Sequence, residues 1–239
     1  MLAVKEPNQL VSGRNISSNP INGVERHEQH VQMSYADFLA VLDDSAHAEW
    51  VNGETLLFMP ASLRHQNVAG FLYMLLRHFA EFFSLGKVFI APFEMKVAPE
   101  SNAREPDILY IATQHLHRLT DKKLEGPADL VIEIISTESV QRDRSDKFYE
   151  YQEAGIREYW LIDPRPSRQR ADFWLLDADG RYQPIPIGQD GRYRSTVLPN
   201  FWLDVNWLWQ NELPSPLLTL AKIVGTQALI DTLRQFDQS

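Results

Sequence analysis

Hydrophobic positions recur along this chain with two different periods, which predict helices and strands in turn. At residues 62–83, apolar side chains fall three or four positions apart, the spacing of one buried helix face. Residues 142–154 carry a second helical pattern, and Gly155 follows at a position where glycine commonly ends a helix. Residues 217–236 predict a further helix that closes the chain.

Short and nearly continuous apolar runs predict strands between these helices. They cover residues 87–97, 106–112, 129–135 and 158–163, and the last two runs are apolar enough to be buried on both faces of a sheet. The order of helix, strands, helix and strand is typical of α/β (α+β) proteins. We therefore expect a mixed central sheet that is flanked by helices.

Turn-forming residues predict smaller elements at both ends of this core. Asn52 and Gly53 lie inside residues 50–59 and predict a β-hairpin on the N-terminal side. Ser34 precedes a short apolar stretch and predicts a capped helix. Two Asp-Gly pairs, at 179–180 and 190–191, separate segments that we expect to form antiparallel strands on the C-terminal side.

The same patterns divide the chain into three parts. Residues 1–32 are polar and lack periodicity, which predicts a flexible N-terminal arm. Residues 33–210 contain all the predicted strands and are expected to form one domain. Residues 211–239 are expected to form a helical tail that packs on this domain.

Composition limits the classes of protein to consider. The chain has 239 residues, of which 44% are hydrophobic, and it contains no cysteine, which excludes thiolate nucleophiles and zinc–thiolate clusters. It shows no secretory signal and no apolar run long enough to span a bilayer, so we expect a cytoplasmic protein. The net charge of −9 disfavours a protein that coats nucleic acid, but it is compatible with a metal-dependent enzyme.

A carboxylate in the middle of an apolar strand is the main candidate for chemistry. Glu133 lies within the apolar run 129–135, where an ionised side chain costs several kcal/mol unless a partner or a metal compensates it. Asp107 stands at the start of the run 106–112. Two acids on adjacent strands can meet at one point, which favours a metal site. The alternative is that Glu133 belongs to a structural ion pair.

The helix after this strand carries a candidate cation. Asp143, Lys147 and Tyr151 are spaced four residues apart, so all three lie on one helix face. Lys147 could contact a scissile phosphate or stabilise developing charge. The alternative is an intrahelical pair between Lys147 and Asp143 on a solvated face.

These residues together resemble the PD-(D/E)XK nuclease superfamily, and more closely the restriction-endonuclease-like proteins of the Uma-two family. The stretches that carry the resemblance are EWVNGE at 49–54, SLRH at 62–65, DLVIEIIS at 129–136, GIREYWLIDP at 155–164 and LPNFWL at 198–203. The resemblance implies a restriction-endonuclease-like core in which Asp107 and Glu133 bind Mg²⁺, or Mn²⁺ in its place, beside a phosphate of DNA.

The chain departs from the superfamily pattern at one position. Ile135 stands two residues after Glu133, where the usual signature has lysine, and Lys147 is the nearest replacement. The family resemblance also includes Glu49, which could complete the metal shell. It includes His65, which could hold a phosphate or a water, or could be a structural histidine.

Three functions therefore remain open from the sequence. The leading hypothesis is a Mg²⁺-dependent endonuclease that hydrolyses DNA as a homodimer, the oligomeric state resting on fold analogy alone. A second is a catalytically inactive binding or assembly protein with the nuclease fold. A third is a metal-dependent hydrolase of a smaller phosphoester.

Overall fold

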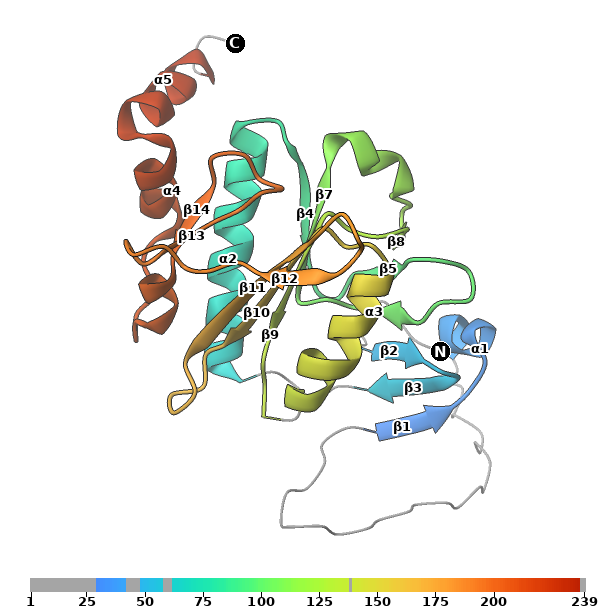
Figure 1. Ribbon diagram of the computed structural model, residues 1–239. Helices are drawn as coiled ribbons and strands as arrows, with labels where there is room; N and C mark the ends of the chain where they lie inside the picture. The colour runs from blue at the N-terminus through green and yellow to red at the C-terminus, as the bar shows by residue number, and fades with distance from the viewer. Residues whose placement is uncertain (1–28, 42–47, 58–61, 138, 237–239) are drawn as a thin grey trace, which may run out of the picture.

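A computed structural model describes residues 29–41, 48–57, 62–137 and 139–236. Its core is a six-stranded mixed sheet with helices on both faces, as the sequence predicted (Figure 1). Only β9 and β10 pair in parallel among its strands, and the other pairs are antiparallel. In order across the sheet, the strands are β12 Tyr182–Pro184, β11 Arg170–Leu176, β10 Glu158–Asp163, β9 Leu130–Ile134, β7 Ile108–Ala112 and β4 Gly86–Ile90.

A second six-stranded sheet is built largely from the N-terminal half of the chain. Its hairpin turns at Asn52 and Gly53, which both have positive φ, as a tight hairpin of this kind requires. The short helix α1, Tyr35–Val41, begins after Ser34, whose hydroxyl accepts a hydrogen bond from the Asp37 backbone. The strands, in order, are β1 Gln29–Gln32, β3 Glu54–Leu57, β2 Ala48–Val51, β6 Ala103–Arg104, β5 Glu94–Lys96 and β8 Lys123–Glu125.

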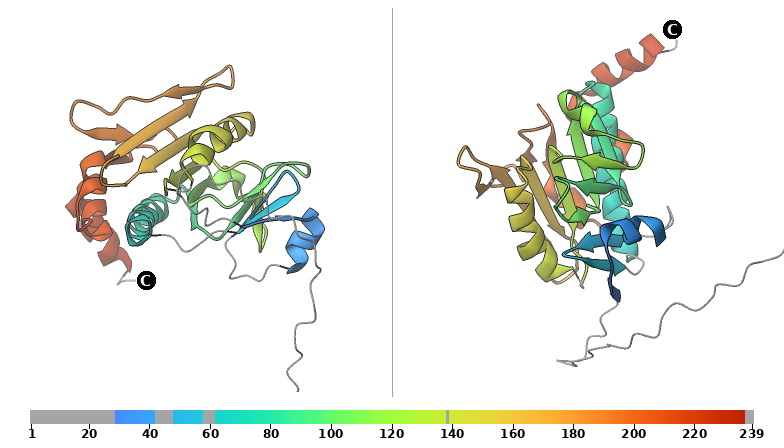
Figure 2. Two further views of the ribbon diagram at one scale, coloured as in Figure 1. Left: turned by 90° about the horizontal axis from the view of Figure 1, so that it is seen from below. Right: turned by 90° about the vertical axis from the view of Figure 1, so that its right-hand side faces the viewer.

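The long helix α2, Leu63–Phe82, and the short helix α3, Lys147–Glu153, cover opposite faces of the central sheet (Figure 2). Alternate residues of β9 divide between these two faces, because side chains along a strand point in opposite directions in turn. Leu130 and Ile132 pack in the cluster that contains α2, whereas Val131 packs in the cluster that contains Tyr159 and α3. Glu133 therefore belongs to the α3 face.

The remaining elements are two C-terminal helices, a short hairpin and three helical turns. The helix α4, Pro216–Val224, packs on α2, and α5, Thr226–Phe236, follows it. A two-stranded hairpin of β13 Arg192–Arg194 and β14 Trp202–Asp204 contributes to the same core cluster as α2. Short helical segments are a 3₁₀ turn at Thr113–Arg118, a π-helical turn at Arg142–Asp146 and a 3₁₀ turn at Val205–Trp209.

Three sequence predictions need correction. Residues 87–97 form two strands, β4 and β5, which belong to different sheets and are separated around Pro92, a residue without a backbone N–H donor. Residues 217–236 form two helices, because the chain turns at Gly225 with φ of 91°. Gln29–Gln32, placed in the N-terminal arm, pair with β3 as β1, while the rest of that arm lies outside the described residues.

No helix within the described ranges is both long and apolar enough to cross a membrane.

One buried carboxylate joins the central sheet to the β13–β14 hairpin. Glu158, at the start of β10, is fully buried and faces the α2 side of the sheet. It accepts hydrogen bonds from the Trp160 indole at 2.7 Å, from the Tyr193 hydroxyl, and from the backbone N–H groups of Thr196 and Val197 at 2.9 and 3.1 Å. Its charge is thus compensated by donors from two strands and a loop.

We expect Glu158→Ala to lower the free energy of unfolding by about 3–5 kcal/mol, because several buried donors lose their acceptor at once. Urea denaturation measures this change. Glu153→Ala is the control, since Glu153 is exposed at the end of α3 and should change stability by less than about 0.5 kcal/mol. Equal effects of the two substitutions would contradict this structural role.

Candidate functional site

The two strand carboxylates predicted from the sequence do come together. Strand β7 pairs antiparallel with β9 so that Ile108 lies opposite Ile132. Continuing this register by one residue places Asp107 opposite Glu133, on the same face of the sheet. The Asp107 carboxylate also accepts a hydrogen bond of 2.6 Å from the backbone N–H of Ile134. Asp107 is therefore held beside β9 at the level of Glu133.

Glu133 is held by two side chains of α3. Its Oε1 accepts hydrogen bonds from Lys147 Nζ at 2.9 Å and from the Tyr151 hydroxyl at 2.7 Å. All three side chains are nearly inaccessible to solvent, Glu133 being 3% exposed. The spacing of four residues thus aims Lys147 and Tyr151 at the strand, as the helix periodicity requires.

Asp107 and Glu133 each engage only one of their two oxygens. Both donors to Glu133 use Oε1, and both contacts of Asp107, from Ile134 and from His65 Nε2 at 3.2 Å, use Oδ2. Within the described part of the chain, Glu133 Oε2 and Asp107 Oδ1 take no hydrogen bond. Two adjacent carboxylates therefore each keep one oxygen available to a ligand.

Lys147 lies among three carboxylates that come from three different elements. Besides Glu133, its Nζ is 3.1 Å from Glu49 Oε1 on β2 and 3.6 Å from Asp143 Oδ1, one turn earlier on the same side of the helix. The Asp143–Lys147 pair, which the sequence offered as the alternative on a solvated face, is thus the longest of its contacts, and both of its side chains are buried. Lys147 mainly joins α3 to the two sheets.

Arg104 holds Glu49 from the opposite side, and sequence reasoning missed it. Its Nη1 donates to Glu49 Oε2 at 2.9 Å, and its Nη2 donates to Glu150 of α3 at 2.7 Å. Arg104 is buried and links α3 through β6 to β2, although the Glu150 side chain at the α3 end is 21% exposed. Arg104 lies outside the runs from which strands were predicted, so no pattern in the sequence pointed to it. Both Glu49 oxygens are engaged, so Glu49 is placed to orient Lys147.

Asp143 lies in the π-helical turn that precedes α3. Its Oδ1 is buried and has no hydrogen-bond partner among the described residues, while its backbone carbonyl accepts from the Tyr159 hydroxyl at 3.0 Å. Turns of this kind often mark functional positions in helices. Burial and the charge of Asp107 raise the pKa of Asp143, against the opposing charges of Lys147 and Arg142.

His65 lies in the first turn of α2, where the Ser62 hydroxyl accepts a hydrogen bond from its backbone N–H. Its ring contacts Asp107 through Nε2, and its Nδ1 is buried without a partner among the described residues. Although burial opposes it, the hydrogen bond and charge of Asp107 raise the pKa of His65. The same contact lowers the pKa of Asp107 against the effect of burial.

Glu133 and Glu49 lie in different electrostatic environments. Burial raises the pKa of Glu133 to about 8, and the charges of Asp143, Asp107 and Glu49 add to this effect although Lys147 opposes it. Glu49 behaves in the opposite way: burial alone would raise its pKa, but Lys147 and Arg104 lower it to about 2. A further cation beside Glu133 would therefore favour the ionised form of its carboxylate.

The donor set fits a hard divalent cation that also takes ligands from water or substrate. Among the described residues, no group of three or more Asp, Glu, His or Cys side chains could hold a metal alone. Mg²⁺ is commonly held by one or two carboxylates, with waters and substrate phosphates completing its octahedron. The unengaged oxygens of Asp107 and Glu133 match this arrangement.

Comparison with solved structures supports the fold. The crystal structure of a "putative nuclease belonging to DUF820" from Anabaena variabilis superposes with a TM-score of 0.58 at 14% sequence identity. The match covers 73% of this chain and 96% of that chain. At this identity the similarity establishes a shared fold and nothing beyond it. A comparison with curated proteins finds no match.

Comparison with protein families gives a broader assignment. The profile of the Uma2 family, described as "Putative restriction endonuclease", matches residues 35–206. This range contains every strand from β2 to β14. It also contains Glu49, Asp107, Glu133 and Asp143, which we call the acidic cluster, together with Lys147. The chain therefore belongs to the Uma2 family and has a nuclease fold.

Proposed function

We propose that this protein is a Mg²⁺-dependent endonuclease that hydrolyses phosphodiester bonds in DNA. The observation that carries the proposal is the pair of unengaged oxygens, Glu133 Oε2 and Asp107 Oδ1, on register partners of adjacent strands. Lys147 supplies a cation at the same point. Membership of a family described as restriction endonucleases and the shared nuclease fold support the reaction class.

Asp107 and Glu133 would hold the ion, with Mn²⁺ as an alternative to Mg²⁺. When bound, the ion polarises the phosphate and lowers the pKa of a bound water. Tyr151 and Lys147 fix the side chain of Glu133 by bonding to one oxygen, so that the other keeps a constant direction. His65 and the Ile134 backbone do the same for Asp107.

Lys147 would stabilise negative charge on the phosphate during the reaction. The charges of Glu133, Glu49 and Asp143 raise its pKa although burial opposes them, so its ammonium stays protonated at neutral pH. A fixed cation in a site with little water is worth more than one in solution, because the medium screens it less. This lysine lies on α3 and would take the role of the lysine that the superfamily signature has at position 135, where this chain has isoleucine.

The two remaining predicted side chains would act through their neighbours. Glu49, whose oxygens contact Lys147, Arg104 and the Glu105 backbone, would position the lysine. His65 would orient Asp107, and its partnerless Nδ1 could bind a water or a phosphate oxygen. The homodimeric state and the cytoplasmic location stay predictions from the sequence.

One observation favours the rival function of an inactive binding or assembly protein. Glu133 and Lys147 form a buried pair with a third contact from Tyr151, so the strand carboxylate has partners even without a metal. A protein of that kind would retain the pair for structure alone. The third function, a metal-dependent hydrolase of a smaller phosphoester, differs from the endonuclease in its substrate and from the inactive protein in having activity.

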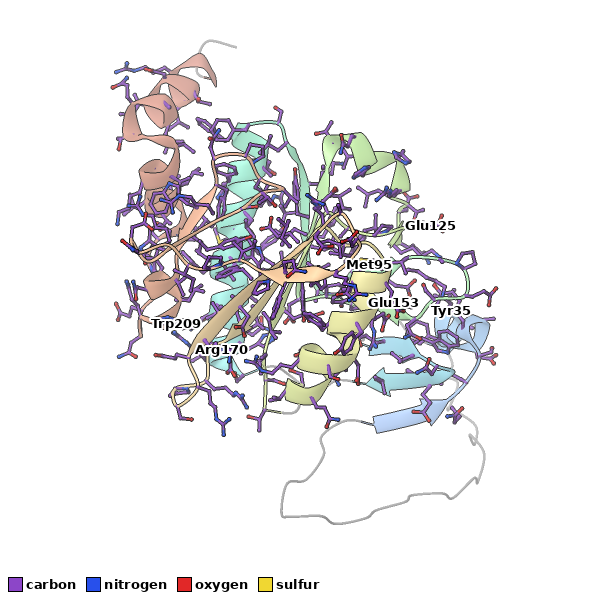
Figure 3. All side chains as sticks on the ribbon, in the orientation of Figure 1. Tyr35, Met95, Glu125, Glu153, Arg170 and Trp209 are labelled. Carbon is purple, nitrogen blue, oxygen red and sulfur yellow. The ribbon has the colours of Figure 1, made fainter. Side chains whose placement is uncertain are left out.

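We expect Glu133→Gln to reduce nicking of supercoiled plasmid by at least about 100-fold, since it removes a charged metal ligand but keeps the side-chain volume. The assay compares Mg²⁺, Mn²⁺ and EDTA for the wild type and the variant, with circular dichroism to verify folding. Glu153→Gln, at the exposed end of α3 (labelled in Figure 3), is the control and should cleave like the wild type.

The outcomes separate the three functions. Cleavage by the wild type in Mg²⁺ but not in EDTA, lost in Glu133→Gln, supports the nuclease. If no plasmid is cut but Mg²⁺ raises the wild-type melting temperature, the metal site stands and DNA is the wrong substrate. A bis-phosphodiester such as bis(p-nitrophenyl) phosphate then tests the smaller ester. If the wild type shows neither cleavage nor a metal effect, the inactive binding or assembly protein is the function that remains.

Binding of Mg²⁺ should tighten as the pH rises from 6 to about 8 and then level off. Glu133 has a pKa raised to about 8, so below that pH the metal must displace a proton, whereas above it the carboxylate is already ionised. Calorimetric titration in buffers of different ionisation enthalpy measures the proton released. An affinity that is constant over this pH range, with no proton released, would contradict metal binding that displaces a proton from Glu133.

Arg104→Met should lower kcat more than it raises KM, because Arg104 acts on Lys147 through Glu49 and does not contact substrate. It should also lower the free energy of unfolding by about 3–5 kcal/mol, since Glu49 and Glu150 lose a buried partner. Arg104→Lys should restore part of kcat. Arg77→Met, which breaks an exposed pair with Glu81, is the control and should change neither by a measurable amount.

A further inference from the structure

A pocket of about 510 Å³ lies on the second sheet and shares no lining residue with the acidic cluster. It is bounded by Tyr35 of α1, by Lys96 with residues 97–99, and by Lys123, Glu125 and Gly126 at β8. Figure 3 shows Tyr35 and Glu125 on the side of the molecule that carries α1, β5 and β8. Pockets of this size commonly hold small ligands.

Lys96 is a buried cation that forms no ion pair with any residue that the structure describes. It is only 6% exposed, and its Nζ donates a hydrogen bond of 2.6 Å to the backbone carbonyl of Ser101. Within the described part of the chain, no carboxylate oxygen lies within 4.0 Å of this nitrogen. A buried ammonium normally has an acidic partner, because removing its charge from water is costly.

Two aromatic rings surround this ammonium but do not neutralise it. Lys96 Nζ lies 4.0 Å from the ring centroid of Tyr35 and 5.1 Å from that of Trp50. Ring faces attract a cation through their quadrupoles, yet they carry no net charge. Burial lowers the pKa of Lys96, and Lys123 lowers it further, while Glu94 opposes the shift. The site therefore retains an unmet preference for an anion.

Lys123 adds a second ammonium on the same ring. Its Nζ is 5.7 Å from the Tyr35 ring centroid, 3.5 Å from the Tyr35 hydroxyl and 3.3 Å from Glu125 Oε1. The Tyr35 hydroxyl in turn donates to Glu94 at 2.5 Å, which orients the ring. The residues that line the pocket include two lysines and one glutamate, and Glu94 adds a second carboxylate beside the Tyr35 hydroxyl.

We propose that this pocket binds a phosphate group, with Lys96 and Lys123 as its two cationic contacts. Lysine is a common phosphate ligand that acts as a point charge with several donors. Within the described part of the chain, Lys96 has one hydrogen-bond acceptor for its three protons, so two protons remain for phosphate oxygens. The phosphate belongs either to a free mononucleotide or to a DNA strand. The proposal is independent of the nuclease activity.

The test is calorimetric titration of 5′-dAMP into the full chain at low salt, with EDTA present to remove divalent metal. We expect Lys123→Met to weaken binding about tenfold, the effect of losing one charge-assisted hydrogen bond. Lys122→Met is the matched control, because it removes the same charge from the adjacent exposed residue outside the pocket. It should bind like the wild type.

Lys96→Met provides a second, independent measurement. If Lys96 serves to bind an anion, the melting temperature of this variant without ligand should be no lower than that of the wild type. Addition of 5′-dAMP should no longer raise the melting temperature of the variant. A marked fall in melting temperature together with no dAMP effect on the wild type would show a purely structural lysine. That result overturns the proposal.

The source of the phosphate is distinguished by a short single-stranded oligonucleotide without a terminal phosphate. Weaker oligonucleotide binding by Lys123→Met, but not by Lys122→Met, assigns the pocket to a strand phosphate. An effect confined to 5′-dAMP assigns it to a free nucleotide. Absence of dAMP binding to the wild type, or equal losses in Lys122→Met and Lys123→Met, would reject the site, since equal losses indicate only diffuse charge.

Discussion

The buried contact between Glu133 and Lys147 is the interaction on which the rest of the site depends. It joins the central strand β9 to the crossover helix α3, and Tyr151 reinforces it one turn further along. A carboxylate at this depth is tolerable only because these donors meet one of its oxygens. The same contact leaves the other oxygen unengaged. Structural stability and an available ligand atom thus come from one arrangement.

The second sheet is part of the candidate site as well as an addition to the core. Through Glu49 and Arg104 it reaches Lys147 and Glu150 on α3, so the helix is held from both sides. This explains why the lysine can lie on a helix: its Nζ is oriented by carboxylates from separate elements. The position is determined by the ion pairs more than by the local backbone.

Charge is distributed unevenly over the protein. Burial raises the pKa values of Glu133 and Asp143, and the charges of neighbouring carboxylates add to the effect, although Lys147, which contacts three carboxylates, opposes both shifts. On the second sheet Lys96 is buried near Lys123, and no described carboxylate forms an ion pair with it, although the charge of Glu94 acts on it. The net charge of −9 gives no sign of either feature, because it sums over sites that are electrostatically separate.

Local patterns in the amino-acid sequence predicted the main elements and the shared helix face of Lys147 and Tyr151, because these follow from periods of two and about four residues. The sequence also placed Asp107 and Glu133 on strands, but the pairing of those strands came from the tertiary structure. Local patterns missed the division of residues 87–97 between two sheets and the break at Gly225. Only the tertiary structure brought Arg104, Glu49 and Glu150 together, and likewise Lys96 and Lys123 at Tyr35. Such contacts join residues far apart in the chain, and they depend on how separate elements pack, which no local pattern encodes.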